Sequence, residues 1–132
     1  MRSALFGGLL LVVLLAVIVA GRYQWQEKEM QWRFHTAEEK LRHQIESERL
    51  IGSSRSRVKR FLDRIGVGHD WYMTDRESGK DPGDADRDIH APNPYVSPIL
   101  VGFTQWTSEV EFRFDRNHHL ASYRFEHTWS TL

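Results

Sequence analysis

The acidic loop that ends at Asp88 has the residue types and spacing closest to those of a metal site. Asp84, Asp86 and Asp88 alternate along it, as the oxygen ligands of a calcium-binding loop do. Such a loop needs glycine at its sixth position and glutamate at its twelfth, where this chain has Ile89 and Tyr95. The mismatch favours a solvated acidic loop, so we expect no calcium-dependent shift in melting temperature.

The histidines are weaker candidates for metal or acid–base chemistry. His118 and His119 are adjacent, so in extended chain they point to opposite faces and do not share a metal ion. His127 falls in the apolar phase of a predicted C-terminal strand. A core histidine with one hydrogen bond explains that position best, because no cysteine and no HExxH spacing accompanies it. We therefore predict neither a metal nor a cofactor; a membrane-bound enzyme or metal protein using His127 and His90 is the alternative.

Motifs for nucleophilic catalysis are missing from the sequence. The chain has no cysteine, no glycine-rich phosphate loop and no nucleophile elbow. Ser53, Ser54 and Ser56 precede a predicted helix, where serines serve as capping and surface residues. We therefore predict that the protein is not an enzyme. The absence of cysteine also excludes disulfides, zinc–thiolate sites and lipid attachment at a cysteine.

Basic residues are concentrated between Arg49 and Arg64, although the whole chain balances 18 Lys and Arg against 18 Asp and Glu. These side chains could meet anionic lipid headgroups, but neutralisation by the acid-rich segment 70–88 is the favoured interpretation. A nucleic-acid partner is not expected, because the segment lacks base-reading residues. The basic face consists of Arg55, Arg57, Lys59, Arg60 and Arg64.

Among the elements that carry these side chains, the N-terminal apolar run is the strongest feature. It extends without a charge from Ala4 to Ala20, between Arg2 and Arg22. As a helix it would be about 26 Å long, the short end of what a bilayer core requires. We predict that residues 1–21 are an uncleaved transmembrane anchor.

A cleaved export signal is the alternative for the same run. The only plausible cleavage position follows Ala20, but the bulky Ile18 precedes it where a small residue is preferred. Tyr23 and Trp25 then follow at the place of interfacial aromatic residues. Cleavage near Ala20 would instead release a secreted binding or inhibitor module.

The charges around the run give conflicting indications of orientation. Arg22, Lys28 and Arg33 favour a cytoplasmic C-terminus by the positive-inside rule. A short, positively charged start before an apolar run is typical of export. We give the export-like start more weight and predict a single-pass protein of the inner membrane, with its C-terminal domain outside the cytoplasm.

Residues 22–51 are predicted to continue the membrane helix as a stalk. They lack proline and glycine and carry an apolar stripe at helical spacing. The stripe could pack on the chain's own domain, on a second copy as a homodimer, or on a partner; its own domain is favoured. The stripe consists of Met30, Phe34, Ala37, Leu41 and Ile45.

Residues 52–132 are predicted to form a two-layer α+β domain, with a helix on an antiparallel sheet. Ser54 caps a helix that reaches Ile65 and buries Val58, Phe61 and Leu62. Predicted strands cover 70–74, an edge strand or irregular cover spans 89–98, and a buried strand spans 99–103. The clearest strands are those on either side of a turn at 115–118, where apolar and polar residues alternate. This hairpin and the helix can bury each other's apolar faces.

The order of these elements resembles the small bacterial envelope proteins of the BamE type, which share the fold of β-lactamase inhibitor protein. The resemblance covers about residues 50–130 and consists of the Gly52-Ser53-Ser54 cap, the helix core face, the aromatic pair Trp71-Tyr72 and the hairpin pattern Phe112-x-Phe114-Asp115-x-x-x-x-Leu120. It implies a non-catalytic domain that works outside the cytoplasm and binds another protein. The chain departs from the family in lacking the lipid-bearing cysteine and in having His118-His119 where the turn usually has glycine.

Together these features predict a non-catalytic accessory or scaffold subunit that is anchored in the membrane and binds another membrane or envelope protein. The residues predicted to contact that partner lie on the stalk close to the membrane: Trp25, Met30, Trp32, Phe34 and Leu41.

Overall fold

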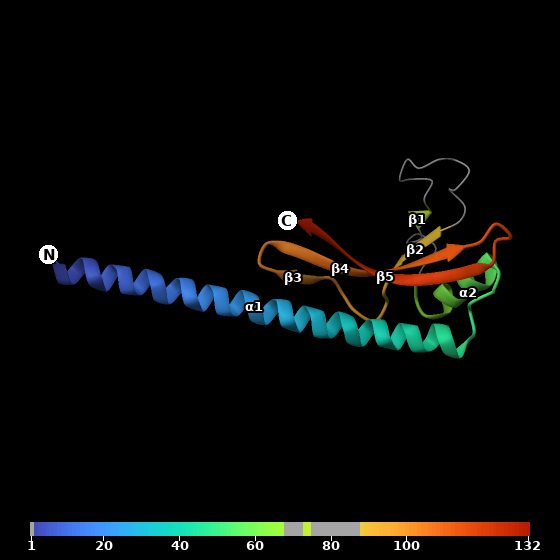
Figure 1. Ribbon diagram of the computed structural model, residues 1–132, viewed down its shortest axis with the longest axis horizontal. Coiled ribbons are helices and arrows are strands. Elements are labelled where there is room, and N and C mark those ends of the chain that lie inside the picture. The colour runs from blue at the N-terminus through green and yellow to red at the C-terminus, as the bar shows by residue number, and fades with distance from the viewer. Residues whose placement is uncertain (1, 68–72, 75–87) are drawn as a thin grey trace.

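The computed structural model describes residues 2–67, 73–74 and 88–132. The described residues form two helices and five strands (Figure 1). The calcium-loop candidate, except for Asp88, and the first residues of the predicted strand 70–74 lie outside the described residues. The elements are α1 (Arg2–Ser47), α2 (Arg55–Arg64), β1 (Met73–Thr74), β2 (Asp88–Pro92), β3 (Ile99–Val101), β4 (Thr104–Phe114) and β5 (Leu120–Thr131).

The sheet is antiparallel and is organised around β4. β5 pairs with β4 along its whole length, from Thr104↔Thr131 to Phe114↔Leu120. The other edge of β4 is shared by β3 and β2, and β1 pairs with β2. Core residues stack across the strands because Ile89 pairs with Phe112 and Val110 pairs with Phe125.

Both helices bury apolar residues against the same face of this sheet, so the predicted α+β architecture is confirmed. The main core combines residues of α1 and α2 with the inward-facing residues of β2, β4 and β5. A second core cluster lies nearer the apolar run, where Met30 and Phe34 of α1 pack with Val101 of β3. The whole apolar stripe of the stalk is buried, which confirms that the stalk packs on its own domain.

The short helix α2 begins and ends as its residues predict. The Ser54 hydroxyl accepts a hydrogen bond from the Arg57 backbone N–H at 3.3 Å. Gly66 follows the helix with a φ of 97°, a conformation that glycine adopts without steric cost. The inward-facing residues are Val58, Phe61 and Leu62.

Two tight turns join the long strands to their neighbours. In the β4–β5 turn, the Asp115 carboxylate accepts backbone N–H groups of Asn117 at 2.8 Å and His119 at 3.0 Å, and both bonds lower the pKa of Asp115. His118 adopts the left-handed conformation there, with a φ of 61°. The β3–β4 turn consists of Gly102, with a φ of 62°, and Phe103.

The prediction of a buried strand at 99–103 is therefore wrong in part. β3 ends at Val101, Leu100 is exposed on the outer face, and Phe103 lies at the turn with 86% of its surface exposed. Only Val101 is fully buried, because a three-residue edge strand presents alternate side chains to the core.

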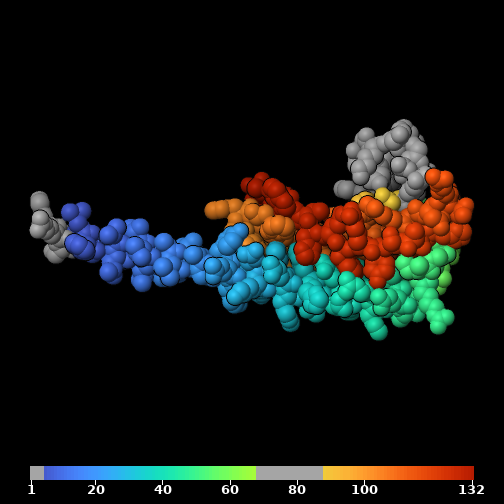
Figure 2. Space-filling view, viewed as in Figure 1, coloured from blue at the N-terminus to red at the C-terminus, as the bar shows by residue number. Residues whose placement is uncertain are grey.

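The first half of α1 projects beyond the domain as a free helix (Figures 1 and 2). α1 is the one helix of the described chain that is long and apolar enough to cross a membrane, and its most apolar stretch is not buried against any other part of the described chain. A single-pass membrane protein and an export signal are both compatible with this helix.

Candidate partner-binding site

Two tryptophans stand on α1 just beyond the apolar run. Trp25 and Trp32 are 64% and 68% exposed. They are seven residues apart, and a helix returns to within about 20° of the same direction over that distance. The two indoles therefore lie on the same side of α1, two turns apart.

The segment between β2 and β3 forms a wall beside Trp32. Its course is fixed by Asn93, whose backbone N–H donates to the Ser108 carbonyl at 2.9 Å and whose Oδ1 accepts the Tyr95 N–H at 3.1 Å. The Tyr95 hydroxyl then bonds to the Gln44 side chain on α1, and the Lys40 ammonium lies 4.2 Å from the Tyr95 ring centre.

A hollow of about 270 Å³ lies between α1 and this wall. It is shallow and mixed in character, since aromatic and aliphatic carbon lines it together with two cationic side chains. Its size suits one apolar or acidic side chain of a partner protein. It is lined by Trp32, Arg33, Thr36, Ala37, Lys40, Tyr95 and Val96.

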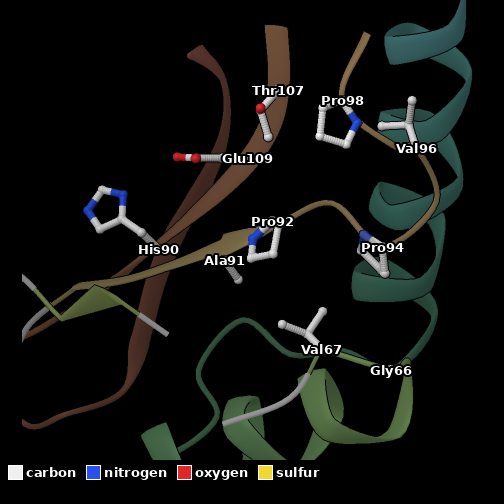
Figure 3. Close-up of a pocket in the computed structure, with 10 residues that line it drawn as sticks. All are labelled: Gly66, Val67, His90, Ala91, Pro92, Pro94, Val96, Pro98, Thr107 and Glu109. Carbon is white, nitrogen blue, oxygen red and sulfur yellow. The ribbon is translucent and has the colours of Figure 1, made fainter. Parts of the chain in front are cut away.

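A larger pocket, of about 490 Å³, lies on the other side of the same segment (Figure 3). Its walls are mostly apolar, and the three prolines in them lack a backbone N–H. His90, Thr107 and Glu109 supply its polar groups. This composition fits an apolar side chain or a short extended peptide. The apolar lining consists of Gly66, Val67, Ala91, Pro92, Pro94, Val96 and Pro98.

Three of the five predicted partner-contact residues are not at the surface. Met30, Phe34 and Leu41 are buried against the sheet, since they form the inward side of α1. This corrects the prediction for these three and leaves Trp25 and Trp32 as the exposed candidates. The periodicity of the stripe showed an apolar face, but it did not show what covers that face.

The carboxylate of Glu38 joins α1 to the hairpin. Its Oε1 accepts the Ser108 hydroxyl at 3.1 Å and the His127 Nε2–H at 2.6 Å. The Phe34 ring lies 4.9 Å from the His127 ring. His127 makes the one hydrogen bond predicted for it, but its side chain is 38% exposed, so it is not a core residue.

This serine, glutamate and histidine do not have the geometry of a catalytic triad. In a triad the histidine lies between the two other groups and accepts the serine proton. Here Glu38 lies between Ser108 and His127, and Ser108 is buried. The arrangement is that of a structural hydrogen-bond network.

Glu111 forms a second network on the sheet face opposite the helices. Arg113 Nε lies 3.1 Å from Glu111 Oε1, and Arg124 bonds to Oε2. Burial, the largest single effect, raises the pKa of Glu111, but the hydrogen bonds from Arg124 and Arg113 outweigh it and lower the pKa below its usual value. Glu111 is therefore a buried carboxylate held in its charged form.

The same carboxylate brings together the ligand atoms of a possible metal site. One ligand atom each from Asp88, His90 and Glu111 lies within 4.8 Å of the others. The two guanidinium groups already use both Glu111 oxygens and place positive charge where a cation would bind. The geometry thus favours an ion-pair network here.

The basic face of α2 is partly neutralised by Glu48, the residue that follows α1. Arg64 forms an ion pair with Glu48, and Arg57 donates to the Glu48 carbonyl at 2.9 Å and to Ser53 Oγ at 3.0 Å. Glu48 was not among the predicted neutralising residues; those of segment 70–87 lie outside the described residues. Arg55 lies over the Phe114 ring, 5.4 Å from its centre.

The position of α2 also argues against the alternative that its basic face meets headgroups of the anchoring membrane. The helix lies at the end of the domain farthest from the apolar run (Figure 1). Ala20 and Ser47 are separated by about 40 Å along α1. A membrane holding the apolar run would therefore be far from α2.

A scan against protein-family models found no match for this chain, and searches of curated proteins and of solved structures found none either.

Proposed function

We propose that this chain is a single-pass, membrane-anchored and non-catalytic accessory subunit, and that its domain lies outside the cytoplasm and binds another membrane or envelope protein. The observation that carries this proposal is the dual role of α1. Its first half is apolar and exposed, and its second half supplies core residues to the domain. The helix shows no break between the two halves.

This continuity supports an uncleaved anchor over an export signal. The candidate cleavage position after Ala20 lies inside α1, which continues to Ser47, and it lacks the small-residue pattern. A continuous helix also transmits the tilt of the anchor to the domain, because no flexible linker separates them. Holding a binding surface at a fixed height and angle is what an accessory subunit of a membrane assembly needs.

The partner surface that we propose comprises Trp25, Trp32 and the hollow beside Trp32. Tryptophan is enriched among the residues that dominate binding energy at protein interfaces. Both indoles lie where a partner embedded in the same membrane would reach them. A homodimer through the stalk stays part of the proposal and would use this side of α1, because the apolar stripe is buried. The resemblance to BamE-type proteins adds the expectation of an envelope partner.

Photo-crosslinking at defined positions tests the partner surface. A photoreactive amino acid is placed at Trp32 in the full-length protein in its native membranes, and in a control at Ile51, which is exposed at the far end of the domain. We expect a discrete crosslinked species at position 32 that is absent at position 51. The same pattern at both positions, or no crosslink at either, would count against the proposal.

The double variant Trp25→Ala/Trp32→Ala measures what the two indoles contribute. We expect it to lose co-purification of the crosslinked partner while its domain unfolds at the same urea concentration as the parent, since both side chains are exposed. Ile51→Ala is the matched control and should retain the partner. Retention of the partner by the double variant would contradict the proposed surface.

The side of the membrane is tested by a topology reporter. Alkaline phosphatase fused after Leu132 folds into an active enzyme only outside the cytoplasm, where its disulfides form. We expect an active fusion. If the full-length fusion protein is present in the cells but inactive, the domain lies in the cytoplasm.

A further inference from the structure

Exposed apolar side chains gather at one end of the domain. Apart from the apolar run and the two tryptophans of the partner surface, the described part exposes six large hydrophobic residues, and five of them lie at the end nearest the run. Leu100 and Phe103 belong to the β3–β4 hairpin. Trp129, which pairs with Trp106, lies near the end of β5, and Leu132 directly follows that strand. The five residues are Tyr23, Leu100, Phe103, Trp129 and Leu132.

The strands that form this end of the domain carry no acidic or basic side chain there. The segment from Ala91 to Ser108 contains no Asp, Glu, Lys or Arg, and neither does the segment from Thr128 to Leu132. The rest of the domain is rich in charge. An apolar protrusion without charged side chains is costly in water and favourable at the boundary between headgroups and acyl chains.

Contacts with α1 fix the height of this protrusion. The Gly102 backbone N–H lies 3.4 Å from Gln26 Oε1, and a Cβ atom at Gly102 would come within 3.3 Å of the Tyr23 ring. The Leu132 N–H donates to the Phe103 carbonyl at 3.2 Å, so the end of β5 is held beside the hairpin turn. The hairpin turn therefore lies against the stretch of α1 from Tyr23 to Gln26, with the apolar run directly beyond it (Figures 1 and 2).

The rise of α1 gives the distance of this level from the bilayer core. Tyr23 and Gln26 are three and six residues beyond Ala20, which corresponds to about 4.5 and 9 Å along the helix. The headgroup layer on each side of a bilayer core is about 5–8 Å thick. If the apolar run spans the core, the hairpin turn lies at the level of the headgroup layer and its outer boundary, and a tilt of α1 toward the hairpin side brings the turn closer to the acyl chains.

We propose that the tip of the β3–β4 hairpin and the end of β5 insert into the headgroup layer of the membrane that α1 spans, with Phe103 as the deepest anchor. This inference rests on the proposed membrane anchor. The domain is then held at two places, by α1 and by the hairpin tip. The second contact prevents rotation of the domain about the helix axis and fixes the direction in which Trp25 and Trp32 face.

Depth-dependent quenching tests this insertion directly. The chain has no cysteine, so a single cysteine introduced into the full-length protein carries one environment-sensitive fluorophore. Three variants are reconstituted in vesicles whose lipids carry nitroxide groups near the headgroup or at mid-chain: Phe103→Cys at the hairpin tip, Arg116→Cys at the exposed β4–β5 turn, and Val12→Cys within the apolar run. The same proteins in unlabelled lipid give the reference fluorescence.

We expect the Phe103→Cys label to be quenched by headgroup nitroxides and to emit at shorter wavelength, and the Arg116→Cys label to show neither effect. Quenching at Val12 but not at Phe103 would overturn this inference and leave the anchor standing. Absence of quenching at all three positions would overturn the anchor and this inference together. Quenching at Arg116 equal to that at Phe103 would also overturn it, because the domain would then lie flat on the membrane.

Discussion

Glu111 shows how one side chain can tie strands together through charge. It is the only charged residue among the buried ones of the described chain, with 3% of its surface exposed. It pairs with Arg113 on its own strand and with Arg124 on β5, directly across from it. Both arginines remain about half exposed. Their guanidinium groups therefore keep much of their contact with water while they form hydrogen bonds with the buried carboxylate.

Glu111→Gln should destabilise the protein at neutral pH and remove part of its acid sensitivity. A carboxyl group with a lowered folded-state pKa contributes stability above its unfolded pKa, here near 4.5, and loses it as the pH falls through the folded value. We expect a loss of about 1.5–3 kcal/mol at pH 7, the range for hydrogen bonds to a charged group. The difference between variant and parent should shrink as the pH falls below about 4.5. Urea unfolding at several pH values measures both effects.

Glu109→Gln is the matched control for this experiment. Glu109 lies on the same strand and the same sheet face, but its carboxylate accepts one hydrogen bond from the Thr128 hydroxyl, at 3.2 Å, and forms no ion pair with Arg113 or Arg124. Its substitution should cost less than that of Glu111. A pH-independent cost for Glu111→Gln equal to that of the control would contradict the role given to the network.

At the scale of elements, α1 changes character along its length without a break. Its first half presents apolar residues on every side, and its second half presents one apolar stripe. The stripe enters the core of the domain, so α1 is a structural element of the fold and not a detached stalk. The boundary between stalk and domain at residue 51 is therefore a change in the path of the chain, with the core extending back to Met30.

The variants Leu41→Ala and Trp32→Ala compare the buried side of α1 with its exposed side. Leu41 is fully buried in the main core, and its truncation should cost about 2–5 kcal/mol. Trp32 is exposed, so its truncation should change the free energy of unfolding by no more than about 0.5 kcal/mol. Urea unfolding of the full-length protein in detergent compares them. Equal effects would mean that the stripe is not part of the core.

The elements with strong local patterns were predictable from the sequence. The apolar run, the stripe of α1, the cap and core face of α2 and the β4–β5 hairpin each follow from the spacing of neighbouring residues. The exposed position of Phe103 was not predictable from the sequence. A short apolar segment does not reveal a turn within it unless Gly102, the residue before Phe103, is interpreted as a hairpin signal.

Contacts between distant residues account for what could not be predicted at the candidate site. Glu38 bonds to His127 and Ser108, and Glu48 pairs with Arg64, across separations that no periodicity encodes. Glu38 does carry a weak signal, since it follows Phe34 by four residues and so lies beside the apolar stripe. Burial of Met30, Phe34 and Leu41 followed from the stripe, but their availability to a partner depended on where the sheet lies.

For the whole molecule, we propose one membrane anchor, one domain and one orientation of that domain. In this proposed arrangement the apolar half of α1 holds the chain in the membrane, the other half builds the domain, and the hairpin tip lies at the level where the two meet. The partner surface then extends from the headgroup layer, at Trp25, to the space just above it, at Trp32. The proposed anchor, the orientation of the partner surface and the insertion of the hairpin tip all depend on the apolar run staying attached to the domain.

The most direct measurement is therefore the mass of the mature protein in fractionated cells. Membranes are washed with alkaline carbonate, which removes peripheral proteins, and the intact mass is measured in the pellet and in the soluble fraction. We predict that the protein stays in the pellet with a mass that includes the apolar run. A shorter chain that begins near Gly21 and is found in the soluble fraction would contradict the anchor and support a secreted binding module.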